Sequence, residues 1–253
     1  MCLINFRWQD HSEYKIIIAA NRDEFYERPT APAHFWEDAP ELLAGRDLLQ
    51  HGTWLGITTQ GKFAALTNFR DPQQRNPDKI SRGAIIKDYL TADTSPRDYM
   101  QSLQNKKDDY AGFNLIAGRP DELFHYNNVH DELSKISPGT HGVSNDSLNT
   151  PWPKVEKGKH LLNVHTQTND VETENLFHML SDTEQAADES LPSTGVSLDL
   201  ERKLSPLFIK TGDYGTRAST VLLIDKQNQV TFVERSFDRG EFAGEEFFSF
   251  QVD

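Results

Sequence analysis

The fold of this chain is decided by two neighbouring stretches, MCLINFRW at residues 1–8 and YKIIIAANRDEF at residues 14–25. Both contain runs of apolar, strand-forming residues, and the polar connection QDHSE at residues 9–13 has the length and composition of a hairpin loop. We therefore predict a β-hairpin with strands at residues 3–8 and 14–20. The first strand begins beside the only cysteine of the chain, and the second ends in a polar cluster.

The polar cluster is the sequence NRDE at residues 21–24, and buried polar groups are costly unless they have partners or a function. With the turn at residues 9–13, the numbers of paired residues sum to about 22, which places Cys2 opposite Ala20. Residues two apart share a face of a strand, so Arg22 and Glu24 then lie on the face of Cys2. A register slipped by one residue would instead place Asn21 and Asp23 there.

The rest of the chain is predicted to contain more strands than helices. Two hairpins fit residues 52–69 and 112–127, and the last strands fit residues 216–225, 229–236 and 246–252. Helices are predicted to begin at Ser81, Pro96, Pro153 and near Val171. Strands at both ends and helices in the middle favour an α+β arrangement of antiparallel sheets covered by helices. No repeat or linker divides the sequence, so we predict a single domain over residues 1–253.

The composition argues against several classes of protein. A net charge of −13 disfavours binding to nucleic-acid backbones, which takes clusters of Lys and Arg. The longest apolar runs are about five residues, whereas ~20 are needed to cross a bilayer, so no membrane insertion is expected. One cysteine cannot form an internal disulfide, and no secretory leader pattern occurs, so we expect a cytoplasmic protein. No zinc-binding or nucleotide-binding motif occurs, so we expect no metal and no cofactor.

Cys2 is a candidate nucleophile because of its position. Cysteine is small enough as a second residue to permit removal of Met1, which leaves Cys2 with both a thiol and a free α-amine. The reference pKa of an α-amine is ~7.7–8.0, so this amine suits the role of general base near neutral pH. A terminal nucleophile activated by its own amine is an attested scheme. Attack on an amide or ester would also need hydrogen-bond donors for the oxyanion.

Five segments carry a resemblance to a known family: MCLINF, AANRDEFYERPTAPAHFW, GTWLGIT, LTNFRDP and GVSNDSLNTPWPKV. They resemble the NRDE family, also called the transport and Golgi organisation family, and the match runs through most of the chain. The resemblance implies a four-layer αββα sandwich of the N-terminal nucleophile type, in agreement with the α+β prediction. A looser similarity reaches the choloylglycine hydrolases and penicillin V acylases, which share that fold and cleave amides with a terminal cysteine.

The looser similarity implies roles for residues beyond the first hairpin. Asn68 in AALTNF and Asn145 in GVSN match asparagines that help to form the oxyanion hole of those hydrolases. Arg217 in GTRAST matches a late arginine near the nucleophile. The alternatives are that both asparagines close turns and that the arginine is a surface strand residue.

The strand end departs from the hydrolase pattern. Alignment puts Asn21 where those enzymes carry Arg and Glu24 where they carry Asp, while Arg22 lies one position off. This departure either changes the substrate or removes hydrolysis. The candidate catalytic residues are therefore Cys2, Asn21, Arg22, Asp23, Glu24, Asn68, Asn145 and Arg217.

Two functions remain open at this point. The first is a Cys2-dependent amide or ester hydrolase acting on a small metabolite. The second is a non-catalytic trafficking or small-molecule handling protein that retains the fold, with haem as a transported ligand and not as a cofactor. Both need a concave pocket for a small-molecule ligand, so the sequence does not choose between them.

Overall fold

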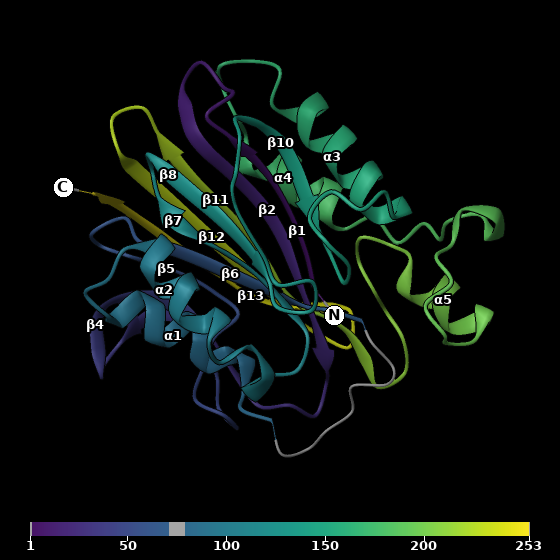
Figure 1. The fold of residues 1–253 in the computed structure, drawn as a ribbon. Helices are drawn as coiled ribbons and strands as arrows, with labels where there is room; N and C mark the ends of the chain where they lie inside the picture. Colours follow the sequence, from purple (N-terminus) through teal and green to yellow (C-terminus); the bar gives the residue numbers. More distant parts are fainter. Residues whose placement is uncertain (1, 71–78, 253) are drawn as a thin grey trace.

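The computed structural model describes residues 2–70 and 79–252, and its strands form two antiparallel sheets that pack face to face (Figure 1). The first sheet has the strand order β10-β1-β2-β11-β12-β13. Its strands, in chain order, are β1 (Cys2–Trp8), β2 (Tyr14–Phe25), β10 (Gly139–Val143), β11 (Tyr214–Asp225), β12 (Gln229–Asp238) and β13 (Glu241–Gln251).

The second sheet has its strands in chain order, from β3 to β9. They are β3 (Thr30–Trp36), β4 (Ala39–Asp47), β5 (Leu55–Thr58), β6 (Phe63–Asn68), β7 (Phe113–Arg119), β8 (Glu122–Asn127) and β9 (Glu132–Lys135).

The described residues form five helices, of which the first four cover the outer faces of the two sheets. They are α1 (Arg82–Thr91), α2 (Pro96–Gln104), α3 (Pro153–His165), α4 (Thr173–Leu180) and α5 (Leu198–Leu204), with single 3-10 turns at Lys107–Asp109 and Asp188–Ser190. Helices α1 and α2 pack on the seven-stranded sheet, and α3 and α4 pack on the six-stranded sheet (Figure 1). In residues 2–70 and 79–252 no helix is long and apolar enough to span a bilayer.

Alternation along the strands explains this layering. In β1, Cys2, Ile4 and Phe6 point into the core between the two sheets, whereas Leu3 points into a second core beneath α3 and α4. A third core lies beneath α1 and α2, where Ile85 is fully buried. A sheet that is apolar on both faces must be covered on both, and this confirms the predicted α+β sandwich of antiparallel sheets.

The first hairpin forms as predicted, but its register differs by two residues. Trp8 pairs with Ile16 and Cys2 pairs with Arg22, so the expected pairing of Cys2 with Ala20 is wrong. Tyr14 lies in β2 because it pairs with Asp225 of β11, not with a residue of β1. A shift of two residues keeps the parity, so Arg22 is still on the face of Cys2.

The second strand is longer than the apolar run from which it was predicted. It continues through the polar cluster to Phe25, because β11 pairs with it on its other edge as far as Tyr214. The polar cluster is therefore part of a strand in the interior of the sheet, and it does not follow the strand. The predicted hairpins of residues 52–69 and 112–127 are present as β5–β6 and β7–β8.

Candidate functional site

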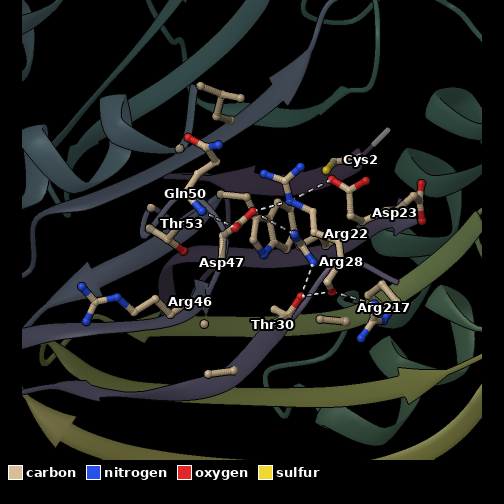
Figure 2. A pocket seen from close by; sticks show the side chains of 18 of the residues that line it. Cys2, Arg22, Asp23, Arg28, Thr30, Arg46, Asp47, Gln50, Thr53 and Arg217 are labelled. Carbon is tan, nitrogen blue, oxygen red and sulfur yellow. Dashed lines mark hydrogen bonds and ion pairs between the residues drawn. The ribbon is translucent and has the colours of Figure 1, made fainter. Parts of the chain in front are cut away.

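A cavity of about 630 Å³ is lined by residues of both sheets and by the first residues of α1. Figure 2 shows Cys2 and Asp23 at one end of it, Arg46 at the other, and Arg22 with Arg28 between them. The candidate residues that line this cavity are Cys2, Arg22, Asp23, Glu24, Asn68 and Arg217. The structure therefore brings six of the eight candidates together.

The Cys2 thiol is buried at the start of β1, directly opposite Arg22. Burial raises the pKa of this thiol, and the negative charge of Asp23 raises it further. The Arg22 guanidinium and a hydrogen bond from the Asp23 backbone act in the opposite direction. The thiol is therefore protonated near neutral pH, and it needs a base to become a nucleophile. Met1 lies outside the described residues.

The Arg22 guanidinium is held in the cavity by one hydrogen bond and one long ion pair to described residues. Its Nη1 donates to Thr30 Oγ1 at 3.3 Å, and its Nη2 lies 3.8 Å from Asp47 Oδ2. Asp47 forms a shorter ion pair with Arg28, which also lies 3.8 Å from the carboxylate of Glu24. Burial is the largest single influence and raises the pKa of Asp47, but the hydrogen bonds from the Gln50 backbone and from Arg28 and the positive charge of Arg28 together outweigh it and hold the pKa below its usual value.

Asp23 places a buried carboxylate in the cavity, at the same end as Cys2 (Figure 2). Its side chain is 3% exposed, and its Oδ1 accepts a hydrogen bond of 2.7 Å from Thr216 Oγ1 on β11. Burial raises the pKa of this carboxyl, and the positive charges of Lys154 and Arg22 and the Thr216 hydroxyl lower it.

Asn21 does not line the cavity. Its side chain lies on the outer face of the sheet, where its Nδ2 donates to the carbonyls of Leu180 and Leu207 at 2.9 and 2.8 Å. Its Oδ1 accepts from Ser219 Oγ at 2.6 Å. The amide therefore connects β2 to the end of α4 and to the segment before β11.

The two predicted oxyanion donors are placed differently. Asn68 lines the cavity at the end of β6, and its side-chain amide makes no hydrogen bond to any described residue. Asn145 is buried behind it, and its Nδ2 donates to the Asn68 carbonyl at 2.8 Å. Ser144 connects this pair to the start of β1, because its hydroxyl donates to the Cys2 carbonyl at 3.0 Å. The Asn68 side chain can therefore contact a ligand in the cavity, whereas Asn145 holds the Asn68 backbone in place.

Arg217 lines the cavity, but backbone carbonyls occupy its guanidinium. Its Nη1 donates to Phe25, Tyr26 and Arg28, and its Nε donates to Phe237. These bonds fix the turn that follows β2, and that turn carries the Arg28 side chain into the cavity.

Two further cavity residues were not predicted from the sequence. Arg82, at the start of α1, donates to the Gly112 carbonyl at 2.9 Å, and burial lowers the pKa of its guanidinium. Glu234 on β12 accepts the Ala33 N–H at 2.7 Å from the opposite sheet, and burial raises its pKa to about 7. The sequence does carry a signal for Glu234, because it follows Val230 and Phe232 at the spacing of one strand face, and both of those residues lie in the core.

The described residues contain no group of three or more His, Cys, Asp or Glu side chains that could hold a metal ion. No histidine lines the described part of the cavity, so Cys2 is its single lining side chain of the types that commonly ligate haem iron.

Comparison with known proteins identifies relatives that match this chain over most of its length. The family model "Transport and Golgi organisation 2" matches residues 1–239. The chain is 35% identical to the "Transport and Golgi organization 2 homolog" of Mus musculus and 37% identical to the homolog of Bos taurus, in each case over 93% of both chains. The predicted family is confirmed.

A solved structure supports the fold assignment. The Caenorhabditis elegans N-acylethanolamine-hydrolyzing acid amidase ortholog superposes with a TM-score of 0.52, over 88% of this chain and 92% of that chain. At 10% identity this likeness shows the fold alone. It agrees with the predicted sandwich of the N-terminal nucleophile type.

Proposed function

The chain belongs to the Transport and Golgi organisation 2 family, and we propose that this member is a Cys2-dependent hydrolase of amide or ester bonds in a small metabolite. The observation that carries the proposal is that a buried thiol, a buried carboxylate and an unoccupied amide donor line one cavity, on Cys2, Asp23 and Asn68. These are a nucleophile, a stabiliser of its base and an oxyanion donor.

The reaction begins from a chain that has lost Met1. The α-amine of Cys2 takes the proton of the thiol, and Sγ attacks the carbonyl carbon of the substrate. The Asn68 amide donates to the oxygen that becomes negative. The C–N or C–O bond then breaks, and the leaving group takes the proton from the α-ammonium. Water, deprotonated by the same amine, cleaves the thioester and gives a carboxylic acid and the free thiol.

Asp23 and Arg22 have separate roles in this scheme. The Asp23 carboxylate offsets the positive charge that the α-amine carries after it accepts the proton. The Arg22 guanidinium lies across the ladder from Cys2 and favours the thiolate. Because burial makes that thiolate costly, the scheme depends on both charges.

The proposal is tested by acylation of the protein with a p-nitrophenyl ester, followed by intact-mass measurement. The expected result is loss of Met1 and gain of one acyl group on Cys2, with none in Cys2→Ala. Equal acylation of Cys2→Ala, or a protein that keeps Met1 and is never acylated, would reject the hydrolase.

A second candidate function is favoured by the burial of the thiol. A raised pKa makes the free thiol a weak nucleophile, and this suits a site that binds a small molecule without reacting with it, whereas ligation of haem iron would take the proton from the thiol. On this alternative the protein handles or transports its ligand, and haem would bind through Cys2 alone among the described cavity residues. Titration with haem distinguishes this version, because ligation through Cys2 shifts the Soret band and Cys2→Ala abolishes the shift.

A further inference from the structure

Lys154 is a buried lysine that the proposed mechanism does not use. It is the second residue of α3, its side chain is 3% exposed, and its Nζ has no hydrogen-bond partner among the described residues. A buried ammonium is costly unless an opposite charge offsets it. Its surroundings must therefore supply a negative charge, or the amine must lose its proton.

Four groups act electrostatically on the Lys154 amine: Asp23 and Cys2, Glu201 of α5, and the opposing Arg70. Glu201 is already committed, because its Oε2 accepts from Arg70 Nη1 at 2.7 Å and its Oε1 accepts from the backbone and hydroxyl of Thr194.

The arrangement of these charges leaves one partner for Lys154. Arg70 is held beside the start of α3, with its guanidinium carbon 4.9 Å from the centre of the Trp152 ring, and it neutralises Glu201. Of the two carboxylates that act on Lys154, Asp23 is therefore the one whose negative charge offsets the Lys154 ammonium. Asp23 is also the first of the groups that raise the pKa of Lys154, which burial lowers to about 8.

We infer that Lys154 is a positioning residue of the Cys2 site: its ammonium keeps the buried Asp23 carboxylate ionised beneath the start of β1. The pairing of Lys154 with Asp23 does not depend on the proposed function. Only the catalytic role of Asp23 rests on it. Without Lys154, the Asp23 carboxyl keeps its desolvation and loses a compensating charge, so its pKa rises further and the protonated form is favoured. A neutral Asp23 no longer stabilises the α-ammonium of Cys2.

The direct test is infrared difference spectroscopy of Lys154→Met against the native protein at pH 7. We expect the carbonyl stretch of a protonated carboxyl to appear in Lys154→Met and to be absent from the double variant Lys154→Met/Asp23→Asn. Glu234, whose pKa is also raised, contributes equally to all these proteins and cancels. Lys154→Arg, which retains the charge, is the matched control and should show no new band. No new band in a folded Lys154→Met would overturn the inference.

If Lys154→Met does not fold, titration of the Lys154 amine in the Asp23→Asn variant tests the same pairing. Asp23→Asn is close in shape to the native residue, and carbon-13 labelling of the lysine side chains follows the Lys154 amine directly. Loss of the Asp23 charge should lower the Lys154 pKa further, because Asp23 is the first of the groups that raise it. An unchanged titration in Asp23→Asn would contradict the pairing.

Acylation rates separate this inference from the proposed function. If Lys154 acts through Asp23, then Lys154→Met and Asp23→Asn each slow acylation of Cys2 by about tenfold, and the double variant is no slower than either. Independent, multiplying losses would mean that Lys154 does not act through Asp23. A native protein that is never acylated would reject the hydrolase, whereas the spectroscopic result for Asp23 would stand.

Discussion

Cys2 lies directly opposite Arg22 in the ladder between β1 and β2, and both residues line the cavity between the two sheets. The Cys2 thiol and the Arg22 guanidinium are thus carried on two strands that the backbone hydrogen bonds of one hairpin hold together. Loop movements cannot separate them without breaking the sheet. This pairing is the basis of the first prediction.

Replacement of Arg22 by Gln should make the Cys2 thiol less reactive. The guanidinium lowers the thiol pKa against burial, so its loss leaves less thiolate at a given pH. We expect alkylation by iodoacetamide at pH 8 to slow severalfold. Arg46→Gln is the matched control, since Arg46 lies at the other end of the cavity and binds Asp38. Equal slowing in both variants would refute a specific role for Arg22.

Replacement of Asn68 by Ala should separate acylation from alkylation. Acylation passes through an oxyanion that the Asn68 amide is free to bind, whereas alkylation by iodoacetamide forms no oxyanion. We expect acylation by a p-nitrophenyl ester to fall by about 10²–10³, the usual cost of one oxyanion donor, with alkylation unchanged. Asn149→Ala, outside the cavity lining, is the control. A parallel loss of both reactions would point to displacement of Cys2 instead.

Replacement of Asn21 by Ala should destabilise the protein without altering the thiol. The variant leaves the Leu180 and Leu207 carbonyls without their donor, and buried unsatisfied groups cost about 1–3 kcal/mol each. Urea denaturation should show a loss of about 2–4 kcal/mol, against less than about 0.5 kcal/mol for the exposed Asn175→Ala. Retention of stability together with loss of acylation would instead return Asn21 to the catalytic residues.

Glu234 should make stability fall as pH rises. Burial raises its pKa from 4.5 to about 7, so the folded state binds more protons than the unfolded state between these values. The protonated carboxyl contributes stability that is fully present below pH 4.5 and is lost as pH rises through about 7. The whole effect is about 3 kcal/mol, and part of it falls between pH 5 and 8.

The variant Glu234→Gln tests this dependence. It retains an acceptor for the Ala33 N–H and cannot ionise, so the free energy of unfolding should depend less on pH between 5 and 8 than in the native protein. Glu132→Gln, at an exposed position on β9, should leave the native pH dependence in place. A native curve that rises with pH in this range and is unchanged in Glu234→Gln would show that Glu234 is already ionised.

Much of the fold is present in local sequence patterns. Alternating apolar residues and short polar turns were enough to predict the first hairpin and the hairpins β5–β6 and β7–β8, because such patterns specify a strand with two different faces. The predicted hairpin also brought Cys2 close to the polar cluster, because the start of one strand lies beside the end of the other. The reasoning from local patterns missed Lys154, although Lys154, Gly158 and Leu162 follow the spacing of one buried helix face.

Both ends of β2 depend on a partner strand far away in the chain. Tyr14 and Phe25 pair with β11, which lies about 190–210 residues later, and no local pattern contains that information. The pairs with β11 keep the polar cluster within the strand, opposite residues that follow Ile209 by several positions.

By itself the sequence determined the family, the layered fold and the parity that puts Arg22 and Cys2 on one face, since parity follows from the pleat of a strand. Only the tertiary structure decided which polar groups are already satisfied. Asn21 and Arg217 bond to carbonyls of other segments, whereas the Asn68 amide is open to the cavity. The physical reason is that a side chain's partners depend on which distant segments are folded against it.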